Sequence, residues 1–101
     1  MPTSRLLGEP NPADSTVQAT SRTLTPATFL NANAARKGCT IQNNSNGYLF
    51  VKYGEGATTS LYSVKVGPNG TLEVPFPAFT GIISGTWAVA GSGNALVTEV
   101  F

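Results

Sequence analysis

The sequence has no histidine, one cysteine and few charges: six Lys and Arg and five Asp and Glu in 101 residues, a net charge of +1. Without histidine, a Ser-His-Asp triad and an imidazole metal site are excluded. A single cysteine forms neither an internal disulfide nor a thiolate zinc site. The near-neutral balance also argues against nucleic-acid binding, which normally needs a basic patch. The composition therefore points away from catalysis and cofactors and towards a protein that binds other proteins.

Long apolar runs are missing as well. Leu6-Leu7 is the only adjacent apolar pair in the first twelve residues, far short of the apolar region of a secretory signal. No run approaches the ~20 apolar residues that cross a bilayer. We therefore expect a chain made in the cytoplasm that makes no membrane contact.

The composition changes near Gly38. Residues 1–38 hold four of the seven prolines but one of the nine aromatic residues, whereas residues 39–101 hold nine of the eleven glycines. We expect an extended N-terminal arm over residues 1–24 and a β domain over residues 25–101, because a polar, proline-containing segment has little apolar surface to bury. The candidate anchors of the arm to a partner are its sparse apolar and arginine side chains, which are common interface hot spots. These are Arg5, Leu6, Leu7, Arg22 and Leu24.

The second part of the chain is a series of short segments with strand composition, separated by turn residues. The expected strands cover residues 39–43, 48–53, 60–66, 71–75, 82–90 (bent at Gly85) and 95–101. Turn signals every 8–12 residues are typical of a sandwich or a small barrel. The sequence therefore predicts an all-β domain, a small antiparallel β-sandwich or a jelly-roll-like barrel.

Three turns are expected between these strands. Asn46-Gly47 predicts a two-residue hairpin of type I′, because both positions of that turn need a positive φ. Gly67-Pro-Asn-Gly70 predicts a second tight turn, and Gly91-Ser-Gly-Asn94 predicts a third.

Two interpretations of residues 25–38 remain open from the residues alone. A helix is suggested by Thr25 as the N-cap, Pro26 as the first helical residue and Gly38 as the stop. A strand at 28–30 followed by a turn through 33–37 fits nearly as well, because Asn31 and Asn33 are poor helix formers.

Residues that suggest chemistry are better explained structurally. Glu55 lies in a glycine-rich loop without a partner acid or base, and Cys39 begins an apolar strand, so a buried structural thiol is expected. Four aromatic residues could instead line a sugar-binding face, although core packing explains most of them. These are Tyr48, Tyr53, Tyr62 and Trp87.

The stretch from Phe29 to Gly54 resembles a pattern in small structural proteins of tailed bacteriophages. It contains a turn Asn33-Ala-Ala-Arg-Lys37, a strand Thr40-Ile-Gln-Asn43 and a strand Tyr48-Leu-Phe-Val-Lys-Tyr-Gly54. Gly81-Ile-Ile-Ser-Gly-Thr-Trp87 and a terminal Val-Thr-Glu are similar to it too, so the resemblance covers about residues 29–100. It implies a β-sandwich virion protein and favours the strand at 28–30.

The resemblance and the expected arm together suggest a capsid decoration (cement) protein. Such a protein would bind the outer surface of the phage head and bridge subunits through its arm, with the major capsid protein or other virion proteins as partners. A homo-oligomer is expected, and a trimer is compatible with that role. The alternatives are a head-fibre, neck or tail accessory protein, and a carbohydrate-binding module for host attachment. An enzyme and a cofactor are not expected.

Overall fold

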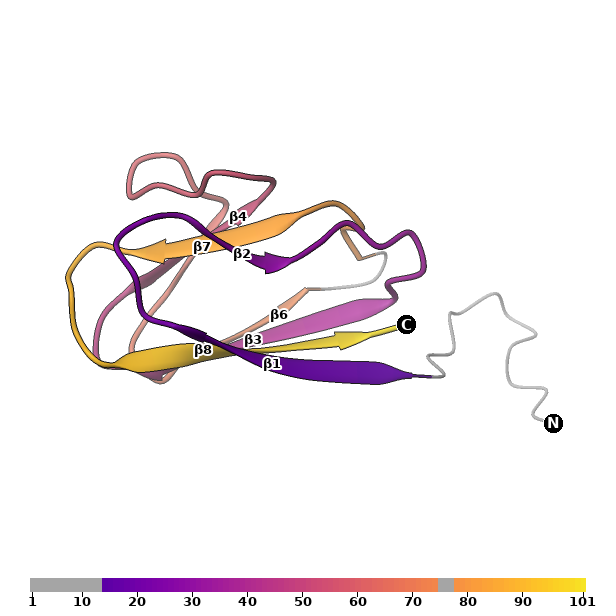
Figure 1. The fold of residues 1–101 in the computed structure, drawn as a ribbon, viewed down its shortest axis with the longest axis horizontal. Coiled ribbons are helices and arrows are strands. Elements are labelled where there is room, and N and C mark those ends of the chain that lie inside the picture. Colours follow the sequence, from indigo (N-terminus) through magenta and orange to yellow (C-terminus); the bar gives the residue numbers. More distant parts are fainter. Residues whose placement is uncertain (1–13, 75–77) are drawn as a thin grey trace, which may run out of the picture.

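A computed structural model describes residues 14–74 and 78–101 and shows an all-β domain of two packed four-stranded sheets (Figure 1). Sheet A consists of β1 (Ser15–Ser21), β3 (Gly38–Ser45), β6 (Thr71–Val74) and β8 (Gly93–Val100). Sheet B consists of β2 (Ala27–Leu30), β4 (Leu49–Tyr53), β5 (Val64–Val66) and β7 (Ile83–Trp87). The expected β-sandwich is confirmed.

The strand order identifies the sandwich as a jelly roll. Sheet A has the order β1-β8-β3-β6 and sheet B the order β2-β7-β4-β5, and all the pairings between these strands are antiparallel. The strands pair as the two arms of one long hairpin, β1 with β8, β2 with β7, β3 with β6 and β4 with β5. Folding that hairpin over itself gives the eight-stranded, two-sheet architecture of a jelly roll.

The core lies between the sheets and follows the alternation of the strands. Cys39 and Ile41 point inwards from β3, and Ala95 and Val97 point inwards from β8. The largest buried side chain is Trp87, whose ring centroid lies 6.2 Å from that of Phe29.

Sheet B is covered on its outer face as well. The backbone N–H of Ala57 donates to Ser84 Oγ (3.0 Å), and Ser84 Oγ donates to the carbonyl oxygen of Gly54 (2.7 Å). The connection after β4 thus lies against β7, and all five residues of β7 are buried. No helix in the described residues is long and apolar enough to cross a membrane.

The segment with two interpretations is a strand and a turn. Ala27–Leu30 pairs with β7, and a turn at residues 34–35 follows, so the helical alternative is wrong. The strand expected over 60–66 is shorter, Val64–Val66, and β7 runs through Gly85 without a break. Glycine is needed there because a methyl group at Gly85 would overlap the ring of Phe29.

The hairpin expected at Asn46-Gly47 is wrong. β3 and β4 lie in different sheets, so this turn carries the chain across the sandwich rather than pairing two neighbouring strands. Neither residue has a positive φ, which a type I′ turn requires. The tight turn at Gly67–Gly70 is confirmed: the Gly70 N–H donates to the Gly67 carbonyl (2.9 Å), and Asn69 has a φ of 59°.

The sandwich begins at Ser15 rather than at residue 25. Ser15–Ser21, within the segment expected to be an arm, pairs with β8 along its whole length as the edge strand of sheet A. Residues 1–13 lie outside the described residues, so the structure describes only the second half of the expected arm.

Candidate protein-binding surface

The structure places two of the five predicted anchors, both in the connection between β1 and β2. Arg22 directly follows β1, and Leu24 is 55% exposed. Arg5, Leu6 and Leu7 lie outside the described residues. The connection is held to sheet B by a backbone hydrogen bond, in which the main-chain N–H of Trp87 donates to the carbonyl oxygen of Thr23 (3.0 Å). The connection between β1 and β2 lies at one end of the sandwich, on the left in Figure 1, and it contains both residues.

The Arg22 side chain ties three connections together at that end. Its Nε donates to the carbonyl oxygen of Val89 (3.0 Å), and its Nη1 donates to Asn46 Oδ1 (2.8 Å). The guanidinium also fills the space beside Gly47 and Gly91, where a Cβ atom would overlap it. Arg22 is therefore a structural residue of this end of the domain, and only the remaining surface of its guanidinium faces outwards.

A groove of about 460 Å³ opens beside Arg22, which we term the end groove. The residues lining it come from three separate segments of the chain. They are Arg22, Asn46, Gly47, Tyr48, Phe50, Ala88, Val89 and Ala90. Tyr48 and Val89 are 53% and 66% exposed, whereas Phe50 is buried. The end groove thus combines an apolar floor with exposed aromatic and aliphatic walls.

Aromatic and cationic contacts continue this surface along sheet B. Lys65 Nζ lies 4.8 Å from the ring centroid of Tyr48 and 5.8 Å from that of Phe50, within the range of cation–π attraction. The ring of Tyr62 meets the Phe50 ring edge-on, with centroids 5.0 Å apart. Tyr48 is therefore held beside a lysine, in a position where a partner can reach one of its faces.

A buried polar network fixes the backbone beneath the end groove. Asn43 is fully buried, and its Nδ2 donates to the carbonyl oxygens of Gly47 (2.8 Å), Val66 (3.0 Å) and Gly67 (3.0 Å). Its Oδ1 accepts from Ser45 Oγ (2.7 Å), and Trp87 Nε1 donates to Ser45 Oγ (3.1 Å). These hydrogen bonds stabilise the connection from β3 in sheet A to β4 in sheet B. Tyr48 lies in this connection, so Asn43 helps to position it.

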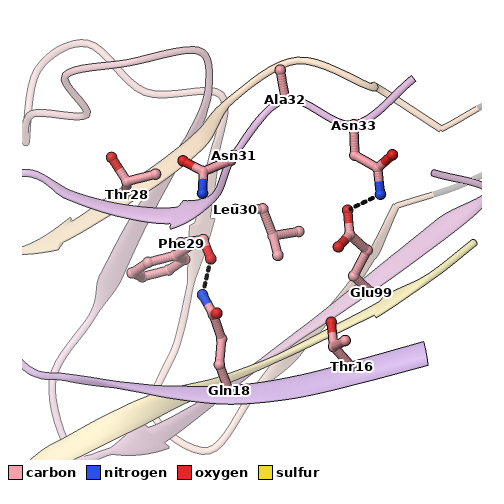
Figure 2. A pocket seen from close by; sticks show the side chains of 9 residues that line it. All are labelled: Thr16, Gln18, Thr28, Phe29, Leu30, Asn31, Ala32, Asn33 and Glu99. Carbon is pink, nitrogen blue, oxygen red and sulfur yellow. Dashed lines mark hydrogen bonds between the residues drawn. The ribbon is translucent and has the colours of Figure 1, made fainter. Parts of the chain in front are cut away.

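A second groove, which we term the side groove, lies between β1 and β2 and has a volume of about 430 Å³ (Figure 2). Its lining is mostly polar: Thr16, Gln18, Thr28, Asn31, Asn33 and Glu99, with Phe29, Leu30 and Ala32. Figure 2 shows Gln18 reaching across it from β1 to donate to the carbonyl oxygen of Phe29. Phe29 and Leu30 are buried, so the side groove presents few apolar atoms to a partner.

Glu99, at one end of the side groove, belongs to a buried ion pair. Arg36 Nε donates to Glu99 Oε2 (2.7 Å), and Asn33 Nδ2 donates to the same oxygen (3.2 Å). The other guanidinium nitrogens of Arg36 donate to the carbonyl oxygens of Phe79, Gly81 and Asn31. Arg36, in the turn Asn33–Lys37, is therefore a structural residue that joins two connections to β8.

Two residues that could suggest chemistry, Cys39 and Glu55, can be placed in the structure. No group of three His, Cys, Asp or Glu residues that could hold a metal ion occurs in residues 14–74 and 78–101. Cys39 is a buried free thiol, and burial raises its pKa to about 11, so it is neutral at physiological pH. This agrees with the expected structural thiol. Glu55 is exposed in its loop, also as expected.

The four aromatic residues considered for sugar binding do not share a face. Trp87 is 1% exposed and packs in the core, so its indole is not available to stack on a sugar ring. Tyr53 is half-buried and stacks on Phe79, with centroids 5.6 Å apart. Tyr48 and Tyr62 remain exposed, and Tyr48 belongs to the end groove.

The end groove was missed at the sequence level, although one signal for it was present. Segment 48–53 is apolar and aromatic at both alternating sets of positions, so one set must point away from the core. Phe50 belongs to that outward set. Val89 carried no signal, because it lies in a connection whose position depends on the packing of distant strands.

Comparisons with known proteins return no relative: no family model, no curated protein and no solved structure matches the chain.

Proposed function

We propose that this chain is a structural protein of a tailed-bacteriophage virion, of the capsid decoration type, that binds protein subunits on the outside of the head. The observation that carries the proposal is the end groove, with exposed Tyr48 and Val89 around an apolar floor. Tyrosine and arginine are enriched among residues that dominate protein interfaces. The sequence resemblance to phage structural proteins supplies the biological setting.

The fold is compatible with this role and does not by itself select it. Jelly rolls occur in viral capsid proteins and also in lectins, so the fold alone is an argument by analogy. The burial of Trp87 weighs against the sugar-binding alternative. The arrangement of the end groove suits an apolar side chain of a partner protein, which would insert against Phe50 between Tyr48 and Val89.

The N-terminal segment remains part of the proposal. Arg5, Leu6 and Leu7 are proposed to add a second contact with neighbouring subunits. Deleting residues 2–13 leaves the edge strand β1 in place and therefore separates the contribution of this segment from the integrity of the sandwich. A larger deletion that includes β1 would remove a paired strand and confuse the two effects.

Binding of purified protein to particles that lack it tests the proposal. Val89→Asp puts a charge into the end groove and is expected to weaken binding at least tenfold, because a buried unpaired charge is costly. Leu61→Asp is the matched control: Leu61 is 65% exposed against 66% for Val89, and it does not line the end groove. Equal binding of the two variants would contradict the role of the end groove.

The number of copies per particle separates a decoration protein from its nearest alternative. A protein that covers the head repeats with the capsid lattice, on the order of hundreds of times, whereas a neck or tail accessory protein is present about a dozen times or fewer.

A further inference from the structure

We propose that the free edge of β1 is the docking surface for a second copy of this chain. The two β1 strands would pair antiparallel about Gln18 and join the two sandwiches through one continuous sheet. This inference goes beyond the proposed function and does not depend on it, because the surface lies on a different part of the domain from the end groove.

The hydrogen bonds at the ends of β1 establish which of its groups are free. Asp14 and Phe101 exchange two backbone hydrogen bonds, 2.8 and 2.9 Å long, and the Arg22 N–H donates to the Gly93 carbonyl (3.0 Å). Since the hydrogen-bonded pairs of an antiparallel ladder alternate, the even-numbered residues of β1 bond to β8. The odd-numbered residues, Ser15, Val17, Ala19 and Ser21, point their N–H and C=O groups to the open side.

Nothing in the described part of the chain protects this edge. β1 pairs only with β8 there, and six of its seven residues are exposed, Val17 by 64%. The strand contains no proline, no charged residue and no break in register. Natural sheets usually carry a proline, a charged residue or a β-bulge on an exposed edge, because an unprotected edge pairs with other strands.

The sequence of β1 is complementary to itself. Ser15-Thr-Val-Gln-Ala-Thr-Ser21 has the same residue types in both directions, except that Val17 takes the place of Ala19. Antiparallel pairing about Gln18 therefore sets serine opposite serine, threonine opposite threonine and Val17 opposite Ala19 of the second copy. Val17 and Ala19 both carry free backbone groups, so this register also aligns donors with acceptors. Ser15 is an exception, because its N–H donates to Asp14 Oδ1 (2.8 Å).

The charge on the surrounding surface permits the contact. On the outer face of sheet A, the side chains beside Val17 and Ala19 are Thr98 and Leu96 of β8, both uncharged. Among the strand residues that the structure describes, the one charged side chain on that face is Glu73, which belongs to β6 at the opposite edge. Two copies can therefore approach edge to edge without placing like charges together.

Disulfide trapping tests both the contact and its register. In the proposed dimer, the two Gln18 residues form a non-hydrogen-bonded pair with Cα atoms ~4.5 Å apart, within the range of a disulfide. Gln18→Cys is expected to form an interchain disulfide under mild oxidation at least ten times more than Thr20→Cys. The two Thr20 residues of the dimer lie ~13 Å apart, four residues along the strands. A mixture of Thr16→Cys and Thr20→Cys is expected to cross-link to the heterodimer.

The native chain is the control for cross-linking through Cys39, because this buried cysteine is present in every variant. Equal cross-linking of Gln18→Cys and Thr20→Cys, or none in either, would overturn the proposal. So would cross-linking that appears only after residues 2–13 are deleted, since the chain's own N-terminal segment would then occupy the edge.

A backbone variant supplies a second readout. Ala19→Pro removes an N–H that points to the open side and leaves the bonds to β8, an arrangement that an edge strand tolerates. Sedimentation equilibrium is expected to show a concentration-dependent dimer for the native chain and a monomer for this variant. At concentrations low enough for the native chain to be monomeric too, the two unfolding midpoints should be nearly equal. A native chain that is monomeric at all accessible concentrations would contradict the proposal.

Discussion

Arg36 and its neighbour Lys37 show how two basic residues in one turn take different roles. Arg36 is 4% exposed, and its guanidinium bonds to one carboxylate and three carbonyl groups. The Lys37 side chain instead donates from Nζ to the carbonyl oxygen of Ala35 (3.3 Å) at the surface. The sequence identifies both as turn residues, but it does not show that Arg36 pairs with Glu99, which is 63 residues away. Long-range pairing of this kind depends on the tertiary fold.

Replacing these residues in parallel tests the assignment. Arg36→Met leaves Glu99 as an uncompensated buried charge and is expected to lower the free energy of unfolding by about 3–5 kcal/mol. Lys37→Met changes an exposed charge and is expected to cost no more than about 0.5 kcal/mol. Urea unfolding of both variants measures the difference, and similar losses would show that the buried pair does not stabilise this end.

Cys39 provides a pH-dependent prediction. Burial is the largest cause that raises its pKa from 9.0 to about 11, so the folded chain keeps the proton that the unfolded chain loses. The contribution of the Cys39 thiol to the free energy of unfolding is therefore fully present below about pH 9. It is lost as the pH rises to about 11. Burial also raises the pKa of Tyr53, which adds a loss of the same sign at alkaline pH.

Unfolding measured from pH 8 to pH 11 is expected to show this alkaline loss in the native chain. The loss should be smaller in Cys39→Ala by up to about 2 kcal/mol, because that variant keeps Tyr53 but has no thiol to titrate. The Cys39 thiol should also react with a thiol reagent only on unfolding at neutral pH. Identical pH profiles for the two proteins would refute the assignment of the shift to Cys39.

The elements of the fold were predictable to the extent that they depend on local pattern. Alternation located β3, β4, β6 and β8, and turn chemistry located the turn at 67–70. The Asn46-Gly47 hairpin failed because the same dipeptide suits any sharp reversal of the chain. Whether such a turn joins neighbours in one sheet or crosses to the other depends on strand pairing over long distances. β1 was missed because its polar sequence buries almost nothing.

The turn between β3 and β4 is stabilised by the buried side chain of Asn43 rather than by a type I′ hairpin. Asn43→Leu removes the donor to three carbonyl groups and the acceptor for Ser45, and is expected to cost about 3 kcal/mol. Asn44→Leu, one residue along on the outer face of sheet A, is expected to change stability by less than about 1 kcal/mol. Comparable thermal unfolding midpoints for the two variants would rule out the corner network as a stabilising feature.

The molecule as a whole combines few charges with a complete two-sheet core. The class of fold followed from composition and strand spacing, because these reflect how a whole domain buries its surface. The beginning of the domain did not follow from them, since β1 pairs through its backbone and contributes no apolar side chain to the core. The end groove likewise requires three segments to meet, and only the fold brings them together.

We propose that this chain binds other proteins in many copies on a phage head. Quantitative mass spectrometry tests this proposal in purified phage particles assembled in the presence of the chain, with the chain counted against the major capsid protein. We expect a fixed ratio on the order of hundreds of copies per particle, as the symmetry of a capsid lattice requires. Absence of the chain from the particles would contradict the virion role, and a dozen copies or fewer would contradict decoration of the head.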